Sequence, residues 1–314
     1  MTQPLPAPAA MRFACPIHKL ALQEGLYCTE CRRTFPEVKG VPVLINDINS
    51  VFSISDYQSP QEAYLGASGY AGHLDSRSGV RQAYRRLMHR LLESGSPVQR
   101  FGVQDALRFV QQERTQARIL VIGAGDSHFA GDVVYTDVAF GRKVDCIADA
   151  HDLPFEDASF DICVAVSVLE HVADPQRCES EMRRVLKPGG FVFAETPFMQ
   201  PVHMGAHDFT RFTYLGHRRL FRCFDDIESG VAGGPAVSAA QTLRYALTAL
   251  SDSPGARRWL RLLGILVTLP LRMLDRLMAS KLSAYDSASA FYFFGRLRET
   301  PLSDREVLRL YRGS

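Results

Sequence analysis

The chain has 314 residues, of which 46% are hydrophobic and 22% charged, and its 36 Lys and Arg against 34 Asp and Glu leave a net charge of +2. This apolar content excludes a long disordered protein, a collagen-like fibre and a disulfide-dense scaffold. The length suits one large domain and a smaller module. A near-neutral chain has no overall attraction to nucleic acid, although a local basic face can still bind it.

The first residues lack the basic start and the apolar run of a secretory signal, so we expect a cytoplasmic protein. Three of the seven cysteines lie near the start of the chain, and the other four are spaced singly through apolar segments. Single cysteines of this kind are usually buried thiols in a reducing compartment.

Two pairs of metal-ligand residues stand near the start of the chain. Cys15 and His18 form the first pair, and Cys28 and Cys31 form the second after a gap of nine residues. Two such pairs on tight turns predict a closed tetrahedral zinc site, which is structural because it leaves no position for water. The alternative is that these are four unrelated residues.

The same segment resembles the small zinc-ribbon family related to the activator subunits of tRNA methyltransferases. In that family two Cys pairs precede an aromatic-Pro pair and a Gly-Ile/Val-Pro sequence, which Phe35-Pro36 and Gly40-Val41-Pro42 match. His18 stands where the family more often has Cys. The resemblance implies a ribbon that binds RNA, binds a partner protein or braces the next domain.

Between the ribbon and the main domain, residues 46–79 have no clear period and are interpreted as a linker or a partly ordered lid. Helical spacing predicts two helices, over 84–92 and 103–110. Short apolar runs then predict strands at 119–122, 133–138, 145–150, 161–166 and 191–196, with a helix over 175–186 that a Pro-Gly turn at 187–190 ends. This alternation predicts an α/β fold with a parallel sheet that binds ligands at the carboxyl ends of its strands.

The first of these strands leads into a glycine turn. Gly123 and Gly125 allow the backbone to approach a ligand closely, but His128 stands where a nicotinamide fingerprint needs a third glycine. Asp137 ends the second strand, where a carboxylate can accept both hydroxyls of a ribose. The alternative for Asp137 is a carboxylate that caps a loop.

From Asp145 to Thr196 the motifs A-D-A-x-x-L-P-F, S-F-D before an apolar strand, L-E-H-V and R-V-L-K-P-G-G follow one another in order. Together they resemble the class I S-adenosylmethionine-dependent methyltransferases over roughly residues 117–225. The resemblance implies a Rossmann-like sheet of seven strands with helices on both faces, and S-adenosyl-L-methionine as the cofactor.

The resemblance also implies roles for individual residues at the cofactor. These are Gly123 and Gly125 for the methionine part, Asp137 for the ribose, Asp149, Ala150 and His151 for the adenine, and Ser167 with Val168 for the methyl side. Val121 stands where the family usually has an acid, and Ser127 replaces a third glycine. These departures imply weaker or rearranged cofactor binding and leave a catalytically silent homologue open.

Polar side chains crowd the segment after the fifth strand, where such a sheet opens onto its substrate. We expect His207 or His203 to act as a general base, Asp208 to orient an imidazole and Arg211 to hold an anionic group of the acceptor. The alternative is that Asp208 and Arg211 form a structural ion pair and the histidines are loop residues. The run also resembles a group of bacterial class I methyltransferases that we associate with cell-envelope glycan or lipid pathways.

The last part of the domain contains an insertion. Strands are predicted at 224–231 and 290–295, the second antiparallel beside the first, with residues 236–284 between them. Residues 257–282 carry six basic residues against one acid and a dense apolar face, and the longest uncharged run is too short to span a membrane. A lid, a contact with a second copy of the chain and a peripheral contact with an anionic membrane surface all remain open.

The predicted organisation is a zinc ribbon over 1–50, a linker with helices over 51–115, the methyltransferase domain over 116–300 and a tail over 301–314. The expected reaction is methyl transfer to an O or N nucleophile of a small-molecule or lipid/glycan-linked acceptor. An RNA methyltransferase is an alternative, because a zinc module precedes this fold in some rRNA guanine methyltransferases, and it needs a basic stripe that includes Arg32 and Arg33. A non-catalytic binding module is a further alternative.

Overall fold

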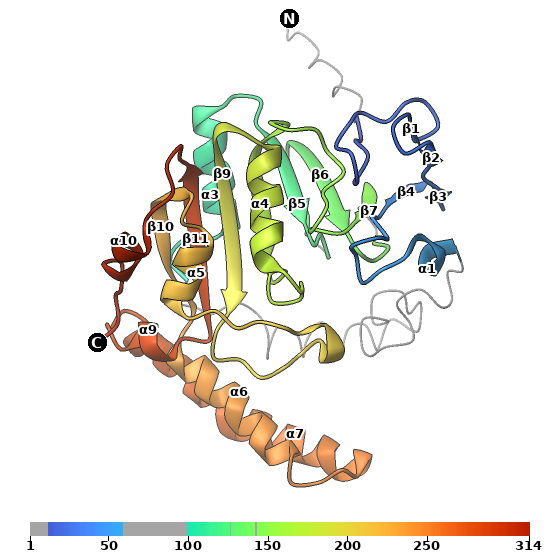
Figure 1. Ribbon diagram of the computed structural model, residues 1–314. Helices are drawn as coiled ribbons and strands as arrows, with labels where there is room; N and C mark the ends of the chain where they lie inside the picture. Colours follow the sequence, from blue (N-terminus) through green and yellow to red (C-terminus); the bar gives the residue numbers. More distant parts are fainter. Residues whose placement is uncertain (1–11, 59–98, 126, 142) are drawn as a thin grey trace, which may run out of the picture. The chain divides into compact units, whose positions relative to one another are not determined.

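The computed structural model describes residues 12–58, 99–125, 127–141 and 143–314 (Figure 1). The chain divides into two compact units. Unit 1 comprises Met1–Gly66, Leu107–Ala165 and Asp174–Val192, and unit 2 comprises Ala67–Ala106, Val166–Ala173 and Phe193–Ser314. The helix expected over 84–92 and the greater part of the segment 46–79 lie outside the described residues.

Five strands predicted from apolar runs are present. They are β5 (Arg118–Ile122), β6 (Asp132–Asp137), β7 (Cys146–Ala148), β8 (Phe160–Val166) and β9 (Leu186–Pro197). In unit 1 they are hydrogen-bonded in the order β9-β8-β5-β6-β7, and β5 pairs in parallel with both β6 and β8. Aliphatic runs such as Ile119–Ile122 are buried throughout, as expected of strands covered on both faces. The predicted α/β fold with a parallel sheet is confirmed.

Helices cover this sheet. α4 (Pro175–Val185) begins at an Asp174 N-cap whose carboxylate accepts a hydrogen bond from the Arg177 N–H, and Figure 1 shows it in front of the strands. α3 (Val103–Glu113), predicted over 103–110, is drawn behind β9 in Figure 1, and its Phe109 ring lies 5.9 Å from the ring of Phe191.

The predicted turn at 187–190 is wrong in one respect. These residues form the first part of β9 instead of a separate connection, and α4 ends at Val185. Gly189 has a φ of 65°, and a Cβ at Gly190 would lie 2.8 Å from the Lys187 carbonyl oxygen. Glycine is therefore needed here because the backbone passes close to other atoms inside the strand. In the sequence, a Pro-Gly-Gly run of this kind is also typical of a turn, which explains the wrong prediction.

The N-terminal part of the chain extends the same sheet. β4 (Val41–Leu44) pairs in parallel with β7, aligning Val43 with Ile147, and β3 (Glu37–Val38) pairs antiparallel with β4. β1 (Tyr27–Cys28) and β2 (Arg33–Thr34) form a separate two-stranded sheet, and α1 (Ile54–Gln58) follows β4. The sheet thus has nine strands, seven of which are those that the methyltransferase resemblance implies.

A buried carboxylate stabilises the start of β8. Asp161 accepts hydrogen bonds from the Arg118 N–H at 2.8 Å, from Lys187 Nζ at 2.8 Å and from the Arg114 guanidinium. Burial raises the pKa of Asp161, but these hydrogen bonds outweigh burial and hold the pKa below its usual value. The ionised carboxylate therefore stabilises the folded state at neutral pH.

Asp161→Ala is expected to reduce the free energy of unfolding at pH 7 by roughly 3 kcal/mol, because it breaks a buried, hydrogen-bonded ion pair. Since the folded pKa is depressed, this contribution is present above about pH 4 and is lost as the pH falls below it. Urea unfolding of both proteins at pH 7 and near pH 2 measures the difference. Asp132→Ala, which removes an exposed carboxylate 3.8 Å from Arg118, is the control and should cost less than about 1 kcal/mol. Equal losses for the two variants would contradict this account.

Unit 2 contains the end of the sheet, in the order β10-β11-β9. β10 (Phe224–Gly233) and β11 (Ala290–Leu297) pair antiparallel, which confirms the two strands predicted at 224–231 and 290–295. Unit 2 also contains the short helices η2 (Gly205–His207), α5 (Tyr214–Leu220) and α10 (Asp304–Leu308). Phenylalanines of β11 are fully buried, and the Arg218 guanidinium lies 4.0 Å from the ring centroid of Phe293.

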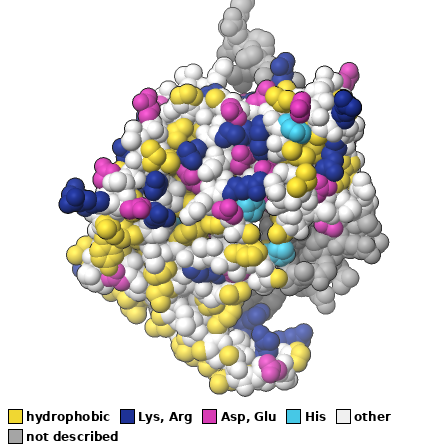
Figure 2. Space-filling view, in the orientation of Figure 1, with side chains coloured by type: hydrophobic (Ala, Val, Ile, Leu, Met, Phe, Trp, Pro, Cys, Tyr) yellow, Lys and Arg dark blue, Asp and Glu magenta, His cyan; other side chains and the backbone are white. Residues whose placement is uncertain are grey.

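The insertion between β10 and β11 is helical, as predicted. It comprises α6 (Pro235–Thr248), α7 (Pro254–Thr268), η3 (Pro270–Leu274), α8 (Asp275–Met278) and α9 (Ala284–Ser287). α6 and α7 pack closely, since a Cβ at Gly264 would lie 3.0 Å from Arg244 Cγ. Trp259 and Leu266 of α7 are nevertheless 74% and 72% exposed, and Figure 2 shows hydrophobic side chains gathered over α6 and α7. Among the described residues, no helix has the length and apolar content to cross a membrane.

Candidate functional site

The glycine turn after β5 is bonded to the end of β6. Gly123 and Gly125 have φ angles of 67° and 50°, and a Cβ at Gly125 would have no atom within 4 Å. Asp137 accepts hydrogen bonds from the Gly125 N–H at 3.0 Å and from the Ala139 N–H at 2.9 Å. A carboxylate can accept up to about four hydrogen bonds. The structure brings three predicted cofactor residues together.

The loop after β7 holds Asp149, Ala150 and His151, all buried. Asp149 accepts hydrogen bonds from His151 Nδ1 at 2.6 Å and from the His151 N–H at 3.0 Å, and its other oxygen accepts one from Ser50 Oγ. His151 Nε2 accepts from the Asp174 N–H at 3.0 Å, so Nδ1 carries the proton and the imidazole is neutral. Burial raises the pKa of Asp149, but the hydrogen bonds from His151 and Ser50 lower it below its usual value.

Residues 46–58 lie over this loop, a contact that sequence reasoning missed. Besides the Ser50 bond to Asp149, Asn46 Nδ2 donates to Asp152 Oδ2 at 2.8 Å. Tyr57 is 2% exposed, and its hydroxyl donates to the Val138 carbonyl at 2.8 Å, directly after Asp137. Residues 46–58 and the loops after β6 and β7 of unit 1 are therefore hydrogen-bonded to one another. The sequence offered no signal for this pairing, because it joins residues about a hundred positions apart.

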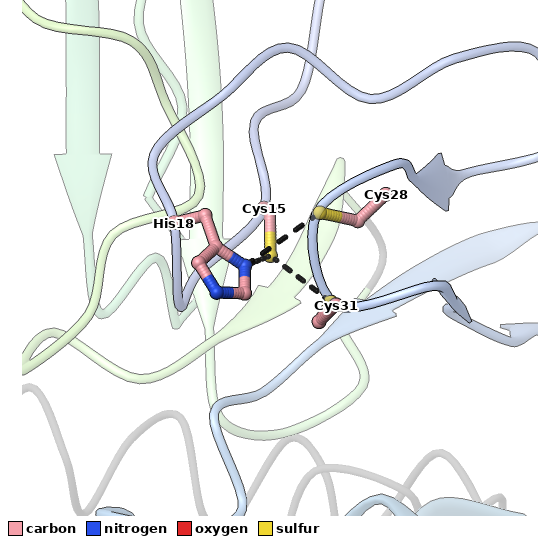
Figure 3. A group of neighbouring side chains, drawn as sticks. All are labelled: Cys15, His18, Cys28 and Cys31. Carbon is pink, nitrogen blue, oxygen red and sulfur yellow. Dashed lines mark hydrogen bonds between the residues drawn. The ribbon is translucent and has the colours of Figure 1, made fainter.

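The predicted metal ligands Cys15, His18, Cys28 and Cys31 lie together, as Figure 3 shows. His18 Nδ1 is 3.7 Å from the sulfurs of both Cys15 and Cys28, and the Cys15 and Cys31 sulfurs are 3.9 Å apart. Bond lengths of about 2.3 Å to sulfur and 2.0–2.1 Å to nitrogen give edges of about 3.6–3.8 Å in a tetrahedral zinc site. The donor set and its spacing therefore fit a zinc ion.

The thiols of this cluster differ in acidity. Burial raises the pKa of Cys15 to about 11. Burial also raises that of Cys28, but hydrogen bonds from the backbone and side chain of Cys31, and from His18 and Cys15, outweigh it and lower the pKa to about 6. The residues after the two pairs, Lys19 and Arg32, have φ angles of 61° and 53°, which is the backbone of two tight turns.

In unit 2, three of the four predicted catalytic residues are in contact. Asp208 forms a bidentate ion pair with Arg211, whose Nη2 lies 2.6 Å from Oδ2, and accepts the His203 N–H at 2.9 Å. Burial raises the pKa of Asp208, but the Arg211 hydrogen bonds outweigh it and lower the pKa to about 2. Arg211 also donates to the carbonyl of Gln200 at 3.1 Å. This pairing matches the structural alternative for Asp208 and Arg211.

Three further predicted residues, His207, Ser167 and Val168, also belong to unit 2. His207 ends η2, and its carbonyl oxygen is 2.7 Å from His171 Nδ1. Ser167 follows β8 with a φ of 54°, and its N–H donates to the Glu195 carbonyl at 3.0 Å. A serine in the left-handed region is strained, and such strain is most common at functional sites. Glu170 and His171 of the L-E-H-V motif also belong to unit 2.

Comparison with known proteins finds a similarity in the centre of the chain. Residues 131–194, which include Asp137 and Asp149, match the family model described as a methyltransferase domain. Residues 131–194 are thus similar to methyltransferase domains. Together with the order of the seven strands, this match confirms the class I resemblance inferred from the sequence motifs.

Two relatives match stretches of 96 and 104 residues of this chain. An uncharacterized methyltransferase of Mycobacterium avium (strain 104) is 38% identical over 96 residues, which are 30% of this chain and 36% of the relative. One from Mycolicibacterium gilvum (strain PYR-GCK) is 40% identical over 104 residues, 30% of this chain and 39% of the relative. The chain thus spans less than half the length of these relatives. A solved structure of Haemonchus contortus phosphoethanolamine N-methyltransferase 2 with S-adenosyl-L-methionine has 17% identity and a TM-score of 0.43, over 75% of this chain and 61% of that one.

Proposed function

We propose that the protein is an S-adenosylmethionine-dependent methyltransferase that acts on an oxygen or nitrogen nucleophile of a small-molecule or lipid/glycan-linked acceptor. The observation that carries the proposal is the hydrogen bond between the Gly123–Gly125 turn and Asp137. Asp137 lies in the segment 131–194, which matches the methyltransferase domain model. Asp137 would hold the ribose, and the loop at Asp149–His151 the adenine. The cofactor, when bound, supplies a methyl group activated by its sulfonium.

The protein's own groups have two tasks in this reaction: to orient the acceptor and to take its proton. We propose His203 or His207 as the proton acceptor. Asp208 lies 3.5 Å from His203 Nδ1, close enough to orient that ring. The donors of Arg211 are directed to Asp208 and to loop carbonyls, and its Nη2 also lies 3.5 Å from His203 Nδ1. Its role in this proposal is therefore to fix the loop that carries both histidines.

The test is a transfer assay with cofactor labelled in its methyl group. Purified protein is incubated with lipid, aqueous small-molecule and RNA fractions of a cell lysate. We expect label in the lipid or small-molecule fraction, and a rate about 100-fold lower in whichever of His203→Ala and His207→Ala removes the base. Label confined to RNA would support the RNA alternative. A protein that binds cofactor but labels no fraction would be a non-catalytic binding module.

The RNA alternative has less support at the ribbon. It needs Arg32 and Arg33 as part of a basic stripe, but Arg33 is paired with Asp47 at 2.7 Å. This ion pair neutralises one of the two cations. Binding of RNA phosphates requires Lys or Arg side chains that are not already paired with a carboxylate. A small-molecule or lipid acceptor is therefore better supported than RNA.

We propose that the exposed face of α7 contacts an anionic membrane surface. Trp259 and Leu266 lie one heptad apart on this helix, and Arg257, Arg258 and Arg261 are exposed beside them. A basic helix with an exposed apolar face is typical of interfacial binding, and it would bring a lipid-linked acceptor to the protein.

The double variant Trp259→Ser, Leu266→Ser is expected to bind anionic vesicles at least about 10-fold more weakly than the wild type, because it removes apolar area from the buried face. Co-sedimentation with anionic and with neutral vesicles measures this. Leu308→Ser, at an exposed leucine of α10, is the control and should bind like the wild type. If wild-type protein bound neither kind of vesicle but formed dimers, the result would instead support contact of this α7 face with a second copy of the chain.

A further inference from the structure

Glu170 is a buried carboxyl group whose oxygens lack a hydrogen-bond partner. Its side chain is 0% exposed, and within the described part of the chain neither Oε1 nor Oε2 is hydrogen-bonded. Leaving such a group unsatisfied costs free energy, and native proteins rarely do so without a reason. Glu170 follows β8 by a few residues in unit 2, and the backbone N–H groups of Phe209 and Thr210 bond only its carbonyl oxygen. The carboxyl group therefore needs another partner.

Two imidazoles face this carboxyl group. His171 Nε2 lies 3.6 Å from Glu170 Oε1, His203 Nε2 lies 3.9 Å from it, and the two nitrogens are 3.1 Å apart. His171 Nδ1 donates to the His207 carbonyl at 2.7 Å, so its Nε2 bears the lone pair. Two nitrogens at this distance share either a proton or a cation. A shared proton would leave both oxygens of Glu170 unsatisfied, whereas a cation would bind both nitrogens and Glu170 Oε1.

The separations suit a single ion. Ligand atoms about 2.0–2.2 Å from a metal lie about 2.9–3.6 Å apart for angles between octahedral and tetrahedral values, and somewhat farther for wider angles. The three observed separations run from 3.1 to 3.9 Å. The side chain of His203 is 35% exposed, which gives the ion a path from solvent. Asp208 Oδ2, 3.5 Å from His203 Nδ1, adds the outer carboxylate that often orients a ligating histidine.

We propose that Glu170, His171 and His203 bind a divalent transition-metal ion, such as zinc, and leave at least one coordination position open to water or to an oxygen of a ligand. Two histidines and one carboxylate are the donor set of open zinc and non-haem iron sites, in contrast to the closed thiolate cluster of the ribbon. Ion binding here does not depend on methyl transfer. If His203 binds the ion, His207 becomes the candidate base of the proposed reaction.

Cobalt(II) distinguishes the two metal sites in the untagged full-length protein. Cobalt bound by the cysteine cluster gives intense thiolate charge-transfer absorption, whereas cobalt bound only by nitrogen and oxygen gives weak ligand-field bands. Metal is first removed and cobalt is then added. We expect the total cobalt bound to wild-type protein to exceed the thiolate-bound cobalt, measured from the charge-transfer absorption, by one equivalent per chain. His203→Ala and Glu170→Gln should lose that equivalent and keep the thiolate absorption.

His207→Ala is the matched control, because it alters a histidine of the same loop and keeps the carbonyl that accepts from His171. It should retain the additional equivalent. Because His203 is partly exposed, His203→Ala should fold even if Glu170→Gln, at a buried residue, does not. Circular dichroism checks that both variants are folded. Wild-type protein that binds cobalt only through thiolates, or His203→Ala that binds as much cobalt as the wild type, would overturn the proposal and leave a hydrogen-bonded histidine pair.

Discussion

Replacement of Asp137 by alanine is expected to weaken binding of S-adenosylmethionine by about 100-fold or more. A carboxylate that accepts two ribose hydroxyls contributes charge-assisted hydrogen bonds of about 1.5–3 kcal/mol each, and tenfold in affinity corresponds to about 1.4 kcal/mol. The substitution also removes the acceptor of the Gly125 N–H and so loosens the glycine turn. Isothermal titration calorimetry of both proteins measures the change.

The control for this prediction is Asp145→Ala. Asp145 also follows β6 closely in sequence and accepts a backbone N–H, that of Tyr135 at 2.7 Å, but the resemblance assigns it no cofactor role. Its affinity for cofactor should stay within a few-fold of the wild type. Thermal unfolding of both variants separates a local loss of binding from loss of fold. An Asp137→Ala protein that is folded and binds cofactor like the wild type would show that the ribose lies elsewhere.

Removal of metal from the ribbon is expected to unfold residues 12–45 and to weaken cofactor binding in the same step. Structural zinc contributes apparent free energies of about 10–16 kcal/mol in small zinc modules, so the ribbon should not keep its fold without it. Because β4 pairs with β7 and Ser50 bonds to Asp149, loss of the ribbon exposes a sheet edge and removes a contact of the loop at Asp149–His151, which we propose holds the adenine. Cys28→Ser should have the same effect as a chelator.

Hydrogen exchange measures this prediction residue by residue. Amides of 12–45 and of β7 should lose protection in Cys28→Ser, while those of β10 and β11 in unit 2 should keep it. Cys223→Ser, at a buried cysteine outside the cluster, is the control and should keep its bound zinc. The zinc assignment would fail if purified wild-type protein held no metal and kept full protection across the ribbon.

The central sheet could be predicted because each strand carries its own local signal. Runs such as Ile119–Ile122 are apolar throughout, and turns or amphipathic segments separate them. The metal ligands were also predictable, since each Cys or His pair is local and only the meeting of two pairs is long-range. The glycine turn and Asp137 followed from their places at the ends of neighbouring parallel strands.

The remaining features depend on contacts that no local pattern encodes. β4 is short and contains Pro42, so its pairing with β7 gave no signal, and Ser50 is one of many serines in an irregular segment. The cluster of Glu170, His171 and His203 joins two segments more than thirty residues apart. The sequence around Glu170 gives no sign that this side chain is buried, which the structure shows it to be.

Direct titration of S-adenosylmethionine into the purified full-length protein tests the central claim, which is that the Gly123–Gly125 turn and Asp137 bind this nucleoside. The account predicts saturable binding of about one cofactor per chain, with competition by S-adenosylhomocysteine. No detectable binding at millimolar cofactor, by calorimetry and by equilibrium dialysis of metal-replete protein, would contradict it.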